Sequence, residues 1–180
     1  VGWIPFAVWT GMRILRKEHI DAIYATGDPW SDFLVARVLS LLTGKPFIMD
    51  MRDPWTLRLG AYPELELGKV RRVIESFWER QCVWAASKVI NVTTEATQMY
   101  KDWYVNVESS KFDCITQGYD PPDFEGIEGI GTAKMTIVAA GTYYNFRTPE
   151  SFLQGLRHLV DLDPKLKEEI KIRFMGIGGS

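Results

Sequence analysis

The order of hydrophobic and polar positions along the chain predicts alternating helices and strands. Over residues 4–17, apolar side chains recur at spacings of three and four, which is typical of an amphipathic helix. Short apolar runs over residues 22–25 and 47–49 predict two buried strands, and a mostly apolar helix over residues 33–42 separates them. A strand, a helix and a strand within about thirty residues indicate a right-handed crossover between parallel strands.

The ends of the second helix carry recognisable start and stop signals. Asp28 precedes Pro29, and this pair predicts that the helix begins at Pro29 with Asp28 as its N-cap. Gly44, followed by Lys45-Pro46, predicts a left-handed residue that ends the helix. Residues 50–63 lack periodicity and contain prolines, so we expect a loop where the chain leaves the second strand.

A long helix is predicted over residues 69–86, because apolar and charged residues alternate there at helical spacing. Its core-facing side chains are expected to be Val70, Val73, Ile74, Phe77 and Trp84. Its water-facing side chains are expected to be mostly Arg71, Arg72, Glu75 and Glu79.

The remainder of the chain repeats the same alternation around a glycine-rich interruption. Strands are predicted over residues 89–92, 112–116, 135–140 and 170–175, and helices over residues 95–104 and 149–162. Gly126, Gly129 and Gly131 punctuate a stretch with little to bury, which is typical of a linker. The predicted fold is α/β with Rossmann-like parallel sheets in two partial domains, residues 1–124 and 134–180, joined by a linker over residues 125–133.

Composition narrows the class of protein. The chain is 46% hydrophobic, 24% charged and 13% aromatic, which suits a packed domain. A net charge of −2 with both signs mixed along the chain argues against nucleic acid as a partner. Two cysteines, Cys82 and Cys114, are too few for a disulfide framework, so a cytoplasmic setting is expected. No apolar run approaches the ~20 residues of a membrane span.

Several motifs, in their order and spacing, resemble those of GT-B-fold glycosyltransferases of group 1, the retaining enzymes of family four. Asp50-Met51-Arg52-Asp53-Pro54-Trp55 resembles a motif that follows a strand of the first domain in one branch. Gln117-Gly118-Tyr119-Asp120 resembles the turn before the second domain, and Gly141 to Arg147 with Pro149-Glu150 resembles its opening loop. The family is about twice as long, so the chain is expected to be an internal fragment.

The resemblance implies a hexosyltransferase that moves a sugar from a nucleotide-sugar donor to a glycan, lipid-linked or small-molecule acceptor. Such enzymes need no obligatory metal or separate cofactor, and polysaccharide biosynthesis is their usual setting. Residues 1–124 would form the acceptor side, and residues 134–180 would begin the donor domain. Peripheral contact with the inner face of a membrane and the oligomeric state are left open, and the fragment alone is expected to be inactive.

On the donor side, Gly141, Thr142 and Arg147 are the candidate ligands of the nucleotide. Arg147 lies before a predicted helix, where a diphosphate would meet both its guanidinium and the helix N-terminus. Gly141 would let the backbone approach the donor, although a plain turn glycine explains it equally well. The family commonly has Arg and Lys where this chain has Thr142 and Thr148, a departure that puts tight diphosphate binding in doubt.

On the acceptor side, Arg52 and Asp53 are the candidate catalytic residues, because they follow a strand's carboxyl end and would face the interdomain cleft. A structural ion pair is the alternative for these two residues. Trp55 and Gly118 are candidate substrate-binding residues, with the Trp55 ring as an apolar platform for a sugar or lipid-linked acceptor. Core packing is the alternative for Trp55, and is favoured for Trp30.

Other signals are weaker. Asp161-Leu162-Asp163 has the form of a metal-binding motif but is predicted to end a helix, and the two histidines lack a ligand cluster around them. Two rival functions stay open: a sugar-nucleotide 2-epimerase of the same fold, and a non-catalytic module that binds a sugar or nucleotide. Catalytic carboxylates and histidines in the cleft would favour the epimerase, and the chain is poor in histidine.

Overall fold

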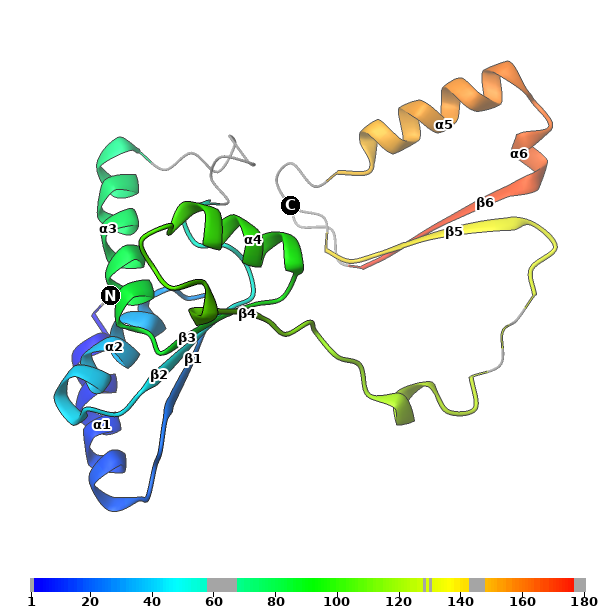
Figure 1. Ribbon diagram of the computed structural model, residues 1–180. Helices are drawn as coiled ribbons and strands as arrows, with labels where there is room; N and C mark the ends of the chain where they lie inside the picture. Colours follow the sequence, from blue (N-terminus) through cyan, green and yellow to red (C-terminus); the bar gives the residue numbers. More distant parts are fainter. Residues whose placement is uncertain (1, 58–67, 128, 130, 143–147, 177–180) are drawn as a thin grey trace. The chain divides into compact units, whose positions relative to one another are not determined.

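The chain folds into two compact units, residues 1–119 and 120–180, in a computed structural model (Figure 1). The structure describes residues 2–57, 68–127, 129, 131–142 and 148–176. Both units are α/β, and both contain a sheet of parallel strands. The α/β class and the parallel strands predicted from the sequence are therefore confirmed.

The first unit is built on a sheet of four parallel strands whose spatial order follows the chain order. The register pairs Thr26 with Asp50 and Asp50 with Ile90, so these residues lie side by side across three strands. The strands are β1 (Ile23–Gly27), β2 (Phe47–Met51), β3 (Lys88–Asn91) and β4 (Phe112–Cys114).

One helix precedes β1 and the others connect the strands, and all of them lie on one side of the sheet (Figure 1). Right-handed crossovers between strands in sequential order place their helices on a single face, which explains this arrangement. The helices are α1 (Ile4–Lys17), α2 (Ser31–Thr43), α3 (Lys69–Ala85) and α4 (Thr94–Trp103), and a 3-10 turn, η3 (Ser109–Lys111), precedes β4. All four helices were predicted.

The boundaries of α2 agree with the sequence prediction at one end only. Gly44 has φ 70° and ends the helix as predicted. The N-cap is Trp30, not Asp28, so the helix begins two residues later than the Asp-Pro pair indicated. A Cβ at Gly27 would lie 2.7 Å from the indole of Trp30, so the Trp30 ring packs directly over the end of β1.

The core of the first unit lies between the sheet and its helices. Strand side chains alternate between the two faces, and those on the helix side are buried. The buried cluster includes Ala25, Phe33, Phe47, Met49, Met51, Val83, Val89, Tyr100 and Phe112. The opposite face is more open, since Tyr24 is 59% exposed there and Asp113 is also exposed. This open face carries the candidate site.

The orientation of α3 differs from the prediction. Val70, Val73 and Phe77, expected in the core, are exposed, whereas Glu79 is fully buried together with Cys82 and Val83. The sequence predicts that these apolar side chains face the core, because the apolar face of a helix is normally the buried one. In the structure the inward face is instead anchored by the hydrogen bonds of a buried carboxylate.

The second unit consists of a parallel strand pair with two helices. The pair is β5 (Met135–Ala140) and β6 (Ile170–Met175), joined through α5 (Glu150–Leu162) and the short α6 (Leu166–Glu169). A 3-10 turn, η4 (Pro121–Phe124), begins the unit. The sequence predicted β5, α5 and β6 and missed α6. Asp161 belongs to α5 and Asp163 caps its C-terminus, as predicted for the end of a helix.

The domain limits inferred from the sequence lead to a test. We expect limited proteolysis of the chain to cut first within residues 125–133, because that stretch is rich in glycine and has no apolar periodicity. Mass spectrometry of the fragments would locate the cut. Earlier cleavage inside α2 or α4, with residues 125–133 intact, would contradict the predicted linker.

Candidate functional site

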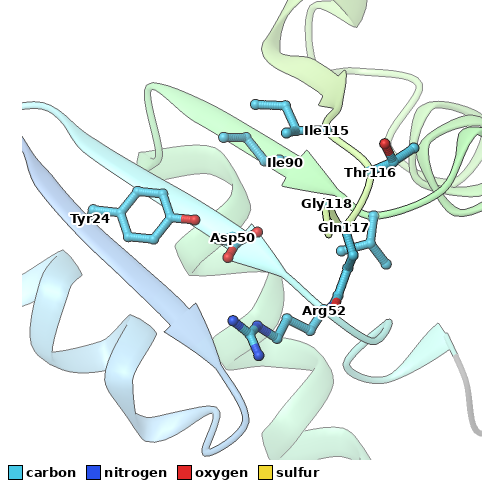
Figure 2. Close-up of a pocket in the computed structure, with 9 residues that line it drawn as sticks. Tyr24, Asp50, Arg52, Ile90, Ile115, Thr116, Gln117 and Gly118 are labelled. Atoms are coloured by element: carbon cyan, nitrogen blue, oxygen red, sulfur yellow. The ribbon is translucent and has the colours of Figure 1, made fainter. Parts of the chain in front are cut away.

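A pocket of about 390 Å³ lies on the open face of the first sheet, at the carboxyl ends of its strands (Figure 2). Ligands of parallel α/β sheets bind at this edge, and the volume falls within the usual range of ligand sites. Every strand of the sheet, or the segment that follows it, contributes. The lining residues are Tyr24, Asp50, Arg52, Ile90, Val92, Ile115, Thr116, Gln117 and Gly118.

Tyr24 and Asp50 form a polar pair on the floor of the pocket. Figure 2 shows the Tyr24 hydroxyl directed toward the Asp50 carboxylate. The pKa of Tyr24 is raised to about 12, because partial burial disfavours the phenolate and because Asp50 favours the protonated phenol, while Arg52 opposes the shift. Tyr24 therefore stays a neutral hydrogen-bond donor at physiological pH.

Arg52 supplies the positive charge of the pocket. Its side chain is exposed, and it makes no hydrogen bond or ion pair with another residue in the part of the chain that the structure describes. A guanidinium carries five N–H donors in a planar fork, which suits hydroxyl, carboxylate or phosphate oxygens. Arg52 is thus free to contact a ligand.

The segment after β4 closes the other side of the pocket. The backbone N–H of Ile115 donates to the carbonyl of Asn91 at 3.0 Å, which keeps the chain beside β3 past the end of β4. Thr116, Gln117 and Gly118 follow and line the pocket. Gln117 adds an amide that both donates and accepts, and Gly118 leaves the backbone accessible.

A buried carboxylate holds the loop that carries Arg52. Glu79 of α3 accepts hydrogen bonds from the backbone N–H of Thr56 at 3.1 Å and from the Thr56 hydroxyl. Its other oxygen accepts the Tyr100 hydroxyl at 2.5 Å, and that hydroxyl accepts the Trp55 backbone N–H at 3.1 Å. Burial raises the pKa of the Glu79 carboxyl, although the hydrogen bonds from Thr56 and Tyr100 oppose the shift.

Trp55 anchors the same loop from within the core. Its ring is 4% exposed, stacks on Trp30 with centroids 5.6 Å apart, and lies 6.1 Å from the ring of Phe33. The indole N–H donates to Glu75 at 3.2 Å, and Arg71 pairs with the same carboxylate at 2.8 Å. The loop therefore reaches the pocket from a rigid base.

The structure brings together some of the residues predicted from the sequence and separates others. Arg52 and Gly118, which are 66 positions apart, line one pocket. Asp53 is exposed and does not line that pocket. Trp55 lies in the core, so packing, the alternative interpretation, accounts for it, and the same applies to Trp30. An exposed ring platform is not what Trp55 offers here.

The donor-side candidates lie in the second unit. Gly141 and Thr142 are exposed at the carboxyl end of β5, and Arg147 lies outside the described residues. Gly141 has φ 150°, a conformation that favours glycine, and its N–H donates to the Met175 carbonyl at 2.8 Å. A Cβ at Gly176 would come within 1.8 Å of the Gly141 carbonyl oxygen, so the close contact between the two strand ends requires glycine at position 176.

Sequence reasoning missed Tyr24, Asp50 and Gln117 as candidate ligands. Asp50 follows an apolar run at the carboxyl end of a predicted parallel strand, and this position could have identified it as a candidate ligand. Tyr24 was not a candidate because its strand was predicted to be buried, which leaves no side chain accessible to a ligand. Gln117 became informative only when the structure placed the segment after β4 beside Arg52.

These features define an α/β protein with parallel-strand sheets and a polar pocket at the carboxyl edge of one sheet. No protein-family model matches the chain, and no curated protein matches it. Within the described part of the chain, no group of three or more His, Cys, Asp or Glu side chains is arranged to hold a metal ion. No helix among those described is long and apolar enough to cross a bilayer.

Proposed function

We propose that the protein is a glycosyltransferase of the GT-B type that transfers a sugar from a nucleotide-sugar donor to a glycan, lipid-linked or small-molecule acceptor. The pocket of the first unit is the observation that carries this proposal. It combines the Arg52 guanidinium, the Asp50 carboxylate and the Gln117 amide with the apolar side chains of Ile90, Val92 and Ile115. That combination suits a sugar, whose hydroxyls need donors and acceptors and whose C–H faces need apolar contact.

The roles of the pocket residues follow from their chemistry. Arg52 and Gln117 donate to sugar hydroxyls, and Asp50 accepts from them. Tyr24, neutral because its pKa is about 12, donates or accepts beside Asp50. Ile90 and Ile115 contact the apolar faces of the ring. The proposal assigns nucleotide binding to Gly141, Thr142 and Arg147 in the second unit, as the family resemblance implies.

Ligand titration of the chain tests this proposal. We expect a sugar nucleotide, such as UDP-glucose or GDP-mannose, to shift the backbone NMR signals of Gln117 and Gly118. Binding without turnover is expected, as the family resemblance implies for this chain. Arg52→Ala should weaken binding at the pocket roughly 10-fold to 100-fold, the usual loss for one charged hydrogen-bonding partner.

The matched control is Arg72→Ala, which removes an exposed guanidinium from α3 and should leave binding unchanged. Free UDP and methyl glucoside, titrated separately, distinguish nucleotide recognition from sugar recognition. Shifts at Gly141 with UDP alone and none at Gln117 with any sugar would favour the non-catalytic nucleotide-binding module. An epimerised sugar nucleotide among the products would favour the epimerase.

A further inference from the structure

The outward face of α3 carries a stripe of exposed apolar side chains. Its members follow the spacing of three and four that places side chains on one side of a helix. Each of them is between 51% and 75% exposed. The stripe consists of Val70, Val73, Ile74, Phe77 and Trp84, and Trp78, 38% exposed, packs edge-on against Phe77 with ring centroids 5.2 Å apart.

Core packing does not account for the stripe, because α3 already uses its opposite face for the core. Glu79, Cys82 and Val83 are buried there. A helix with 3.6 residues per turn places Glu79 about 180° from Val70. The stripe therefore faces away from the sheet of its own unit.

The charges exposed on α3 are almost all positive. Lys69, Arg72 and Arg80 are exposed, and Arg71 is 69% exposed beside Glu75. The carboxylates are turned inward, since Glu79 is fully buried and the Glu75 side chain is only 18% exposed. The helix thus presents a cationic surface on a chain whose net charge is −2.

Three of these four cations flank the stripe, whereas Arg72 lies about 160° from Val70 around the helix axis. With 100° per residue, Lys69 and Arg80 project about 80–100° to one side of Val70, and Arg71 about 100° to the other. Long basic side chains in these positions extend their charged ends toward the head groups and water when the apolar face enters a lipid interface. Phe and Trp are typical of that apolar face, and Lys and Arg of its flanks.

We infer that the outward face of α3 docks on the surface of a bilayer that contains anionic lipids, through the stripe of Val70, Val73, Ile74, Phe77 and Trp84. Charge complementarity selects this occupant, because the exposed cations Lys69 and Arg80 beside the stripe match anionic head groups, while Arg71 on the other side is paired with Glu75. A second copy of the chain would bring the same cations together across the interface. This inference does not rest on the proposed transferase function.

Flotation of the chain with vesicles tests the inference. We expect the chain to float with vesicles of phosphatidylcholine containing 30% phosphatidylglycerol, and to float much less with pure phosphatidylcholine. Binding should fall in 0.5 M NaCl, because salt screens charges at a surface. Failure to float with the anionic vesicles would overturn the inference.

Two double variants separate the apolar and the charged contributions. Ile74→Glu with Phe77→Glu should reduce flotation to background, because two carboxylates would enter the interface. Lys69→Gln with Arg80→Gln should weaken partitioning roughly 25-fold, about fivefold for each cation near an anionic surface. The matched controls are Leu41→Glu, at a 76% exposed apolar position on α2, and Lys165→Gln, at an exposed position before α6.

Circular dichroism should show the same helix content in all variants, since every substituted side chain is exposed. Flotation of the Ile74→Glu, Phe77→Glu variant at the wild-type level would contradict the inference. A wild-type dimer in light scattering that the same variant converts to a monomer, without vesicle binding by either, would assign the stripe to a second copy instead.

Discussion

Replacing Trp55 by alanine is expected to lower the free energy of unfolding by about 3–5 kcal/mol, the usual cost of removing a buried aromatic side chain. The ring is 4% exposed and stacks on Trp30, and its N–H donates to Glu75. Alanine would leave a cavity beside Phe33 and remove that hydrogen bond. The loss should appear as a lower midpoint of urea unfolding followed by circular dichroism.

Two other substitutions make this result specific to the packed ring. Trp55→Phe keeps most of the buried apolar surface, so it should cost less than Trp55→Ala. Trp103→Ala removes an indole that is 65% exposed, and should change the unfolding free energy by less than about 1 kcal/mol. If Trp55→Ala were as stable as wild type but bound sugars poorly, the ring would be a substrate platform after all.

Replacing Glu79 by alanine is expected to cost about 2–4 kcal/mol. The carboxylate accepts hydrogen bonds from the Thr56 N–H, the Thr56 hydroxyl and the Tyr100 hydroxyl. Alanine would leave these buried donors without an acceptor, at about 1–3 kcal/mol for each group that finds no new partner. Relief from burying a carboxylate offsets part of that loss. Urea unfolding measures the net effect.

Two substitutions serve as references for Glu79→Ala. Glu79→Gln keeps an acceptor oxygen and the side-chain volume, so its cost should be smaller. Glu18→Ala removes an exposed carboxylate at the end of α1 and should be within about 0.5 kcal/mol of wild type. Equal stability of Glu79→Ala and Glu18→Ala would show that the hydrogen bonds of Glu79 do not hold the loop.

The pH dependence of the Glu79 effect has a definite sign. Burial raises the pKa of this carboxyl above its usual value of 4.5, so above pH 4.5 the folded chain keeps a proton that the unfolded chain releases. By linkage, the free energy of unfolding falls as pH rises from 4.5 through the raised pKa. The stability of wild type relative to Glu79→Gln should therefore decline across this window, because glutamine does not titrate there.

The alternation of elements was readable from the sequence because it depends on local periodicity. Helix spacing over residues 4–17, glycine at position 44 and short apolar runs predicted α1, the end of α2 and the strands. Arg52 and Gly118 were also chosen from the sequence, because both belong to motifs that follow strands. The carboxyl ends of parallel strands gather ligand-binding segments wherever such a sheet forms.

The direction in which α3 faces could not be read in this way. The apolar positions predict that one face of α3 is buried, but the buried residues lie on the opposite face. Glu79 is buried there because it accepts hydrogen bonds from Thr56 and Tyr100, which are 23 and 21 residues away in the sequence. A buried carboxylate is tolerated only where such partners converge. That convergence is a property of the folded chain, and a helical pattern considered alone favours the apolar face.

The sequence by itself determined the α/β class, most element boundaries and two residues of the pocket. The tertiary structure decided which other residues line the pocket and which of the predicted site residues do not. Trp55 lies in the core because Trp30 and Phe33 pack against it. Tyr24 and Asp50 line the pocket because the strand register sets one face of the sheet toward solvent. Local periodicity follows from the chain's own geometry, whereas side-chain neighbours depend on contacts between residues distant in sequence.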